Sequence, residues 1–331
     1  MTIKYNNVYL NNTFTIGGIY EDDGPLGNYF DKTYKSDLYF GEKSLEKAEI
    51  RLLIDCVNCL LEKNNLSSDK IDLLISGDLD NQIVSSNYMA RSFSTSFLGV
   101  FSACATMGEG LIIGSNFIDS KKINNVVVST VSHNMVSEKQ FRNPTEYGTL
   151  KPKTATFTTT GSAAVLLSNT KSDLKIESAT IGKVVDLNVK DVNNMGAVMA
   201  PAAADTIYNH LTNLKREVSY YDLIVTGDLG KYGKNILIEY MKEQYNIDIS
   251  KNYNDCGVML FDTKKQPVLA GASGPACSAL VTFGYLIKQM KEYKIKKILY
   301  VPTGALFNPT IVFQKESIPA IAHAVSIEVV E

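Results

Sequence analysis

The chain has 331 residues, of which 45% are hydrophobic and 21% charged, with 33 basic against 35 acidic side chains. This balance excludes a disordered chain and a protein that coats a polyanion, so we expect no nucleic-acid partner. The apolar runs fall short of the ~20 residues that span a bilayer, and the N-terminus lacks the pattern of a secretory signal. Five Cys favour free thiols. We expect a soluble intracellular protein.

Two motifs occur twice in the same order. Asp72-Leu-Leu-Ile-Ser-Gly-Asp-Leu79 is echoed by Asp222-Leu-Ile-Val-Thr-Gly-Asp-Leu229, and both are typical of a buried parallel strand that runs into a loop. Downstream, Ser102-Ala-Cys-Ala105 and Pro275-Ala-Cys-Ser278 each begin an apolar helix. Repeated landmarks in a constant order indicate that the chain is an internal duplication.

The elements predicted in chain order support this duplication. The first half is expected to contain a helix over 45–63, a strand within 72–79, a helix from about 104 to 118, and strands over 126–131 and 163–168. The second half is expected to contain a helix over 203–215, a strand within 222–229, a helix from about 275 to 290, and strands over 298–301 and 322–330. Each half, 1–170 and 171–331, therefore reads β-α-β-α-β-α-β-β. This alternation predicts an α/β fold of two stacked αβα units that share a central helical layer, an αβαβα arrangement.

Cys104 is the first candidate site residue. Small residues surround it where an apolar run ends and a helix begins, and the positive end of that helix favours the reactive thiolate. A buried packing role is the alternative reading. Cys56-x-x-Cys59 resembles a redox or zinc pair, but it lies on the core face of a predicted helix without a second pair, so we expect packing and no metal site. Cys256 and Cys277 are also read as packing residues.

The three His have different contexts. His133 follows a strand, where ligand-facing loops of parallel sheets gather, although it is equally suited to anchoring a loop. His210 is expected to be a half-exposed helical residue, and His323 a packed residue at the start of the last strand. The polar stretch 132–160 reads as a long functional loop, and its capable side chains include Asn134, Arg142, Tyr147, Lys151 and Lys153. The glycine-rich Gly271-Ala-Ser-Gly-Pro275 is best read as a tight turn into a helix, because it lacks a nucleotide-binding fingerprint.

In its duplication and in the position of Cys104, the chain resembles the thiolase superfamily, which includes the ketoacyl synthases. That resemblance implies a nucleophilic Cys at the position of Cys104, with further catalytic His, Asn or Cys on three loops of the second half. The corresponding loops here are Thr226-Gly-Asp-Leu-Gly-Lys231, Gly271-Ala-Ser-Gly274 and Pro302-Thr-Gly-Ala305, and none holds a His, Cys or Asn. Because losing one oxyanion donor costs ~10²–10³ in rate, this departure argues against a condensing enzyme. We expect a pocket without the reaction.

A narrower resemblance covers nearly the whole chain. It rests on long motifs that generic thiolases lack, among them Gly24-Pro-Leu-Gly27, Gln140-Phe-Arg142, Pro144-Thr-Glu-Tyr-Gly148, Met199-Ala-Pro-Ala-Ala-Ala-Asp-Thr206 and Lys315-Glu-Ser-Ile-Pro319. These are similar to the stage V sporulation protein AD family of endospore-forming bacteria. The resemblance implies a thiolase-like binding protein in the machinery that moves dipicolinic acid, pyridine-2,6-dicarboxylate, with its calcium into the developing spore. It also implies association with the inner membrane of the forespore, through membrane proteins of the same operon.

The implied site occupies the ancestral acyl pocket, where backbone N–H groups at a helix N-terminus suit an anion. The predicted ligand contacts are Cys104, His133, Asn134, Arg142, Asn81, Asp228, Lys153 and Tyr147. No catalytic residue, metal site or cofactor is predicted apart from calcium carried by the ligand, with Asp78 or Asp228 near it. Asp228 is expected to repel the ligand unless calcium lies between them.

Two other functions stay open on the sequence. An acyl-transfer enzyme would use Cys104 with His133 or His323 as base, and a scaffold would dock to membrane partners with a vestigial pocket. The resemblance to thiolases also implies a homodimer through the edge of the first-half sheet.

Overall fold

The computed structural model describes residues 1–141 and 151–330. One mixed sheet path runs through the described chain, in the order β11-β10-β13-β16-β9-β2-β8-β6-β4-β5. Its first-half strands are β2 (Tyr9–Gly17), β4 (Leu73–Gly77), β5 (Phe97–Gly99), β6 (Asn125–Ser132) and β8 (Gly161–Ser168). Its second-half strands are β9 (Leu174–Thr180), β10 (Leu223–Thr226), β11 (Tyr253–Asp255), β13 (Lys297–Val301) and β16 (Ala324–Val329). The short β1 (Thr2–Lys4) and β3 (Lys32–Thr33) pair with β9 and β2.

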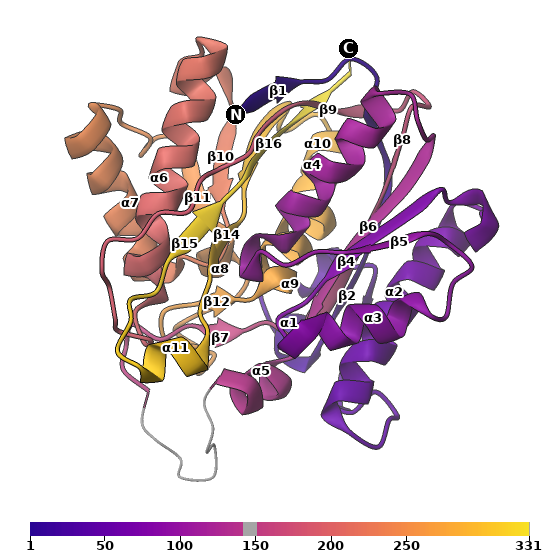
Figure 1. Ribbon diagram of the computed structural model, residues 1–331, viewed down its shortest axis with the longest axis horizontal. Helices are drawn as coiled ribbons and strands as arrows, with labels where there is room; N and C mark the ends of the chain where they lie inside the picture. Colours follow the sequence, from indigo (N-terminus) through magenta and orange to yellow (C-terminus); the bar gives the residue numbers. More distant parts are fainter. Residues whose placement is uncertain (142–150, 331) are drawn as a thin grey trace.

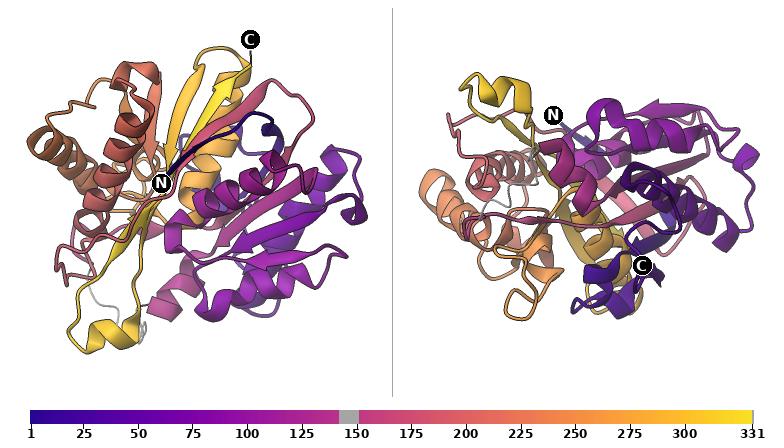
Figure 2. Two further views of the ribbon diagram at one scale, coloured as in Figure 1. Left: turned by 45° about the horizontal axis from the view of Figure 1, so that its top comes forward. Right: turned by 90° about the horizontal axis from the view of Figure 1, so that it is seen from below.

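The two halves have the same topology, which confirms the duplicated fold. In each half the first strand lies beside the fifth, followed by the fourth, second and third. The second, third and fourth strands of each half are parallel to one another, and the fifth pairs antiparallel on both sides. The halves meet where β2 pairs with β9. Figures 1 and 2 show the indigo-to-magenta half beside the red-to-yellow half, with β9 and β16 between them.

Five layers follow from alternation along the strands. In β13, Ile298 and Tyr300 point into the central core, while Leu299 and Val301 point into an outer core. The central layer consists of α4 (Thr106–Asp119) and the continuous helix of α9 (Pro275–Leu280), a π-helical segment (Val281–Leu286) and α10 (Ile287–Lys291). The outer layers are formed by α2 (Leu45–Lys63) with α3 (Val84–Ala90), and by α6 (Met195–Leu214) with α7 (Gly230–Tyr245).

The remaining short elements lie mostly at the edges of these layers. They are α1 (Ile19–Asp22), α5 (Asn134–Phe141), α8 (Cys256–Met259), α11 (Pro309–Phe313), β7 (Phe157–Thr158), β12 (Ala272–Ser273), β14 (Thr303–Ala305) and β15 (Ala320–Ala322). The four short strands form two small sheets, β7 with β12 and β14 with β15.

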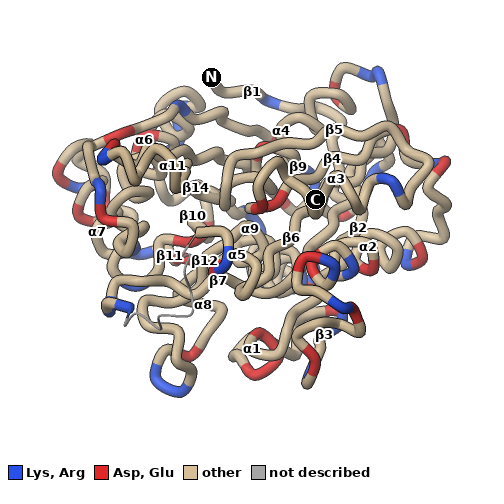
Figure 3. The backbone as a smooth tube through the Cα atoms, turned by 60° about the horizontal axis from the view of Figure 1, so that its bottom comes forward, with Lys and Arg blue, Asp and Glu red and all other residues tan. Residues whose placement is uncertain are grey.

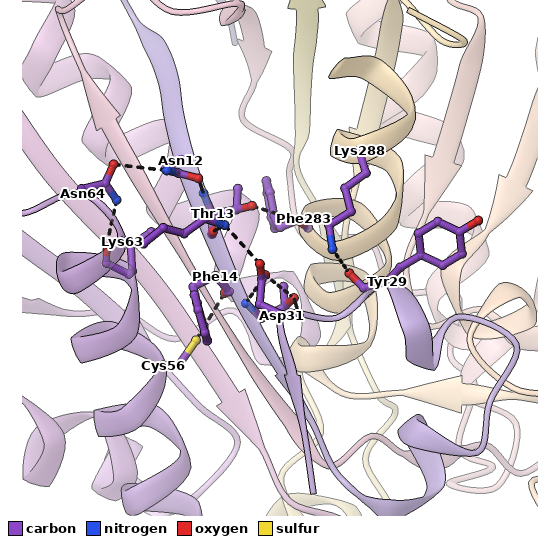
Figure 4. A network of polar contacts seen from close by, with 12 residues as sticks. Asn12, Thr13, Phe14, Tyr29, Asp31, Cys56, Lys63, Asn64, Phe283 and Lys288 are labelled. Carbon is purple, nitrogen blue, oxygen red and sulfur yellow. Dashed lines mark hydrogen bonds and ion pairs between the residues drawn. The ribbon is translucent and has the colours of Figure 1, made fainter. Parts of the chain in front are cut away.

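Polar contacts around β2 join the first-half outer layer to the central layer (Figure 4). The Lys63 ammonium, from α2, donates to the Thr13 carbonyl at 3.0 Å and to the Asp31 carboxylate at 3.1 Å. The Thr13 hydroxyl donates to the Phe283 carbonyl, 3.0 Å away in the central helix. Cys56 is fully buried, and its thiol donates to the Phe14 carbonyl. The prediction that Cys56 packs in the core is therefore confirmed.

Several sequence predictions need correction. The helix expected over 203–215 begins at Met195, because the Asn194 side chain accepts the Ala197 N–H as an N-cap. His210 on this helix is fully buried, bonded to Thr180 and Tyr221, and not half-exposed. The expected last strand is split into β15 and β16 at His323. The stretch 132–160 is less loop-like than expected, because residues 134–141 form α5.

None of the helices in the described ranges combines the length and the apolar character needed to cross a bilayer. Of the outer helices, α2 and α7 carry both basic and acidic residues (Figure 3).

Candidate functional site

A pocket of about 860 Å³, counting the space at its open mouth, lies between the two halves next to Cys104. Its apolar lining comes from both halves: Leu79, Phe101, Ala103, Phe141, Val192, Met195, Met199, Ala305 and Phe307. Its polar lining consists of Cys104, Ser137, Glu138, Thr156, Thr158, Asn193, Ser273 and Gly274. A largely apolar pocket with a few convergent polar groups is the usual form of a small-molecule site.

Cys104 reaches this pocket because of a tight turn before α4. Ala103 adopts a left-handed conformation with φ of +49°, and residues Ala103–Ala105 form a 3-10 turn that leads into the helix. The Thr106 hydroxyl holds the turn by donating to the Ala103 carbonyl at 2.6 Å. Gly304 lies against it from the second half, where a Cβ would approach the Ser102 carbonyl oxygen to 2.2 Å. The small residues noted in the sequence therefore serve this close approach.

The chemistry of Cys104 differs from the prediction. Burial raises the pKa of the Cys104 thiol well above its ordinary value, and the nearby Asp228 carboxyl raises it further. The Gly274 backbone N–H acts in the opposite direction but does not compensate. The expectation that the helix N-terminus favours thiolate is wrong, because desolvation of the charged form outweighs the helix field here. Cys104 is therefore a neutral thiol.

The opposite wall is a two-stranded sheet that joins the halves. β7 pairs in parallel with β12, so that Thr158 stands beside Ser273. The Thr159 N–H donates to the Ser273 carbonyl at 2.8 Å. Gly274 follows with φ of +95° and caps α9, which begins at Pro275. This confirms the tight turn predicted for the glycine-rich segment and brings Ser273 to the pocket.

Asp228 lies beneath the pocket near Cys104 and is not part of its lining. It is fully buried, has a φ of +71°, and neither carboxylate oxygen has a hydrogen-bond partner, although the Cys277 thiol lies beside it. Burial, together with the nearby Asp255, raises the pKa of Asp228 well above its ordinary value. A raised pKa favours the protonated form of Asp228, which would not repel an anion as the sequence predicts for the charged form.

None of the three His, all of which the structure describes, lines the pocket. His133 anchors a loop: its Nε2 donates to the Leu38 carbonyl at 2.9 Å, and its Nδ1 accepts the Met135 N–H at 3.2 Å. His323 accepts the Gly182 N–H at Nδ1, which places Nε2 3.5 Å from the Ser102 hydroxyl. Burial lowers the pKa of His323 to about 4.

The other predicted contacts are dispersed. The Asn134 amide donates to the Thr158 carbonyl at 3.2 Å and so supports the wall behind its lining face. Asn81 and Lys153 are exposed and do not line the pocket. Arg142 and Tyr147 lie outside the described residues.

Sequence reasoning missed most of the lining. Val192, Asn193 and Met195 precede or begin α6, and Phe307 follows β14, in segments that carry no recognisable motif. Glu138, which is ion-paired with Lys151 at 2.7 Å, lies in the polar stretch 132–160 that the sequence singled out, although it was not among the predicted ligand contacts. The Thr cluster around 154–160 was the available signal for Thr156 and Thr158.

The duplicated fold is thiolase-like. A structure of a Xanthomonas campestris OleA variant bound with cerulenin matches with a TM-score of 0.63 and 14% identity, covering 98% of both chains. The 3-oxoacyl-[acyl-carrier-protein] synthase III from Aquifex aeolicus matches with a TM-score of 0.51 and 16% identity, covering 99% of both.

A closer relationship appears in sequence. The family model for stage V sporulation protein AD matches residues 1–328. The stage V sporulation protein AD of Bacillus subtilis (strain 168) is 47% identical over 321 residues, which cover 97% of this chain and 94% of that protein. The chain belongs to the stage V sporulation protein AD family, and it is a sporulation protein with a thiolase-like fold.

Proposed function

We propose that the chain is a non-catalytic binding protein for dipicolinic acid, and that this ligand occupies the pocket beside Cys104. The chain belongs to the machinery that moves the ligand into the developing spore, where it works with membrane proteins of the same operon at the inner membrane. The observation that supports the proposal is a largely apolar pocket beside Cys104 whose lining holds this Cys but no His.

The lining suits a planar ring that carries two carboxylates. Phe101, Phe141 and Phe307 offer apolar and aromatic surface for the ring. Thr156, Thr158 and Ser273 carry hydroxyls along the opposite wall, and the Gly274 N–H is directed toward the same region. Hydroxyl and backbone N–H donors can satisfy carboxylate oxygens that leave water.

The charge of the ligand requires a counter-charge. The described lining residues include no Lys or Arg, and Glu138 is already paired with Lys151. The positive charge therefore comes from chelated calcium or from Arg142, which lies outside the described residues. Asp78, one of two residues expected near calcium, does not line the pocket, and burial raises the pKa of Asp228.

Calorimetric titration with dipicolinate, with and without calcium, tests this proposal. We expect saturable binding that Cys104→Ala and Ala305→Phe weaken at least tenfold, because both change the pocket wall. Cys59→Ala is the matched control, since Cys59 lies partly exposed on α2 away from the pocket. No heat at millimolar ligand with a folded protein would reject the proposal and favour the scaffold.

An acyl-transfer function is the second candidate, because Cys104 occupies the place of the thiolase nucleophile with the Gly274 N–H aimed at it. An acyl-coenzyme A incubated with the protein should then leave an acyl mass on Cys104. We expect no adduct, because the thiol is neutral and no His lines the pocket.

We also propose a homodimer through β5. This strand ends the sheet path, and Leu98 is 40% exposed on it. Phe101, which also lines the pocket, follows β5 by two residues and is 48% exposed. Light scattering after size exclusion should give twice the mass of 36.4 kDa, and Leu98→Lys should yield the monomer.

A further inference from the structure

Three buried carboxylates gather behind the pocket wall, between the first-half sheet and its outer helices. Glu49 comes from α2, and Asp78 and Asp80 come from the turn after β4. Their exposed fractions are 1%, 0% and 4%. One carboxylate oxygen from each lies within 4.8 Å of those of the other two. This spacing allows a single ion to contact all three.

The two Asp are held in place by the turn itself. Asp78 accepts the Asp80 N–H at 2.9 Å and the Ser86 N–H at 2.7 Å, one on each oxygen. Asp80 accepts the Ser85 hydroxyl at 3.1 Å. Each carboxylate oxygen has two acceptor positions, so these bonds orient the Asp without using up their capacity to bind a cation.

Glu49 is the observation that points to a ligand. Neither of its oxygens has a hydrogen-bond partner, although the side chain is almost fully buried and faces Asp78 and Asp80. The neighbouring cation, Lys139, is ion-paired with Glu46 at the surface. Within the described residues, Glu49 therefore faces carboxylates with no positive charge and no donor of its own.

Protonation of Glu49 is the alternative to a bound cation. Burial and the neighbouring carboxylates raise the pKa of Glu49, and burial raises that of Asp80 to about 7. A protonated Glu49 could donate to the Asp78 or Asp80 carboxylate, since their oxygens lie within 4.8 Å of its own, but the remaining carboxylate charge would stay buried without a cation. A buried polar group without a partner is unfavourable, whereas one cation would serve all three carboxylates.

We propose that Glu49, Asp78 and Asp80 bind one hard divalent cation of the Mg²⁺, Mn²⁺ and Ca²⁺ class. Oxygen-only, anionic donors select these ions over the softer ones that Cys and His bind. The ion would tie α2 to the turn after β4, and Leu79, which lies between the two Asp, lines the pocket. The site is distinct from the pocket, because none of its three ligands belongs to the pocket lining.

The test uses the full chain, treated with chelator and free of dicarboxylate, so that its result does not depend on the proposed pocket ligand. Mn²⁺ is titrated and followed by electron paramagnetic resonance, and the unfolding temperature is measured with and without it. We expect one bound Mn²⁺ per chain, a higher unfolding temperature with Mn²⁺, and competition by Mg²⁺ or Ca²⁺.

Glu49→Gln should weaken Mn²⁺ binding at least tenfold and abolish the rise in unfolding temperature. Glu21→Gln is the matched control: Glu21 is also 1% exposed with one unpartnered oxygen, but it stands outside the cluster. Asp228→Asn should also bind like the wild type, which separates this site from the pocket. If Glu49→Gln does not fold, Asp80→Asn carries the same expectation. Absence of bound Mn²⁺ in the wild type, or wild-type binding by Glu49→Gln, would overturn the proposal.

Discussion

The same tripeptide, Gly-Asp-Leu, lies at the end of a parallel strand in each half, yet the hydrogen bonds of its Asp differ between the two halves. In the first half Asp78 accepts two backbone N–H groups, and the second of them belongs to Ser86 in the first turn of α3. In the second half Asp228 accepts none. The difference shows that the two copies of a duplicated motif can lie at the same place in the fold while their side chains form different contacts.

Asp228 accepts no backbone N–H because another carboxylate takes that role. Asp255, at the end of the neighbouring strand β11, accepts the N–H groups of Leu229 and Gly230 at the start of α7. It also accepts the Thr226 hydroxyl at 2.8 Å. Asp255 therefore caps α7 as Asp78 caps α3, and Asp228 is left near Cys104 beneath the pocket.

The largest effect is expected when this substitute cap is removed. Asp255→Ala would leave two buried N–H groups unpaired and remove one partner of the Thr226 hydroxyl, which also bonds to Tyr253, so we expect it to lower the free energy of unfolding by about 3–5 kcal/mol. Urea unfolding at pH 7.5 measures this. Asp248→Ala is the control, since Asp248 is exposed and accepts one N–H from Ser250; a similar loss there would refute the capping role.

The two Asp should then respond differently to the same substitution. Asp78→Asn replaces an acceptor with a donor that meets a backbone N–H, and should destabilise the metal-free protein by about 1–3 kcal/mol. Asp228→Asn should leave the free energy of unfolding nearly unchanged at pH 6, because a protonated carboxyl and an amide are similar in size and both are uncharged. Equal losses in both variants would contradict the comparison.

The pH dependence of Asp228 has a definite sign. Its folded pKa is raised above the value of 3.8 that is ordinary for Asp. The folded state therefore holds a proton that the unfolded state has lost, and stability falls as the pH rises above about 3.8. Asp228→Asn removes this contribution, so the variant should gain stability relative to the wild type between pH 6 and pH 9. A constant difference over this range would show that Asp228 is ionised.

A smaller effect on stability is expected from backbone strain in the turn after β10 and in the turn after β4. Gly230 has a φ of +64°, and a Cβ there would lie 2.8 Å from the Ala270 carbonyl oxygen, so Gly230→Ala should cost about 1–2 kcal/mol. Gln82, exposed with a φ of +60°, already bears such strain. Gln82→Gly should change stability by less than about 1 kcal/mol. Thermal unfolding compares the two, and a loss at Gln82 as large as at Gly230 would refute this account.

The smallest effect concerns the thiol. Cys104 and Cys59 are both partly exposed, yet Cys104 should react with iodoacetamide more slowly, because burial and Asp228 raise its pKa well above the ordinary value. Asp228→Asn should speed the Cys104 reaction a few-fold at pH 9 by removing the carboxyl. Mass spectrometry of the modified peptides reports both rates. If Cys104 of the wild type is alkylated faster than Cys59, the result would favour the acyl-transfer function.

Much of the fold was predictable because it depends on local patterns. The helix 45–63 was predicted with its observed limits, since Ser44 caps it and its apolar residues recur on one face. The strand 126–131 was predicted within one residue at each end, because a run of Val is typical of a buried strand. The candidate site was less predictable: Cys104 lines the pocket, whereas His133, Asn81 and Lys153 do not.

The sequence by itself determined the family, the duplicated αβαβα arrangement and the place of Cys104, because periodicity, small residues and long motifs are properties of neighbouring positions. Only the tertiary structure decided that the pKa values of Cys104 and Asp228 are raised and that Glu49 lies beside Asp78 and Asp80. Burial and the distance between charges set those properties, and both arise when segments far apart in the chain pack together.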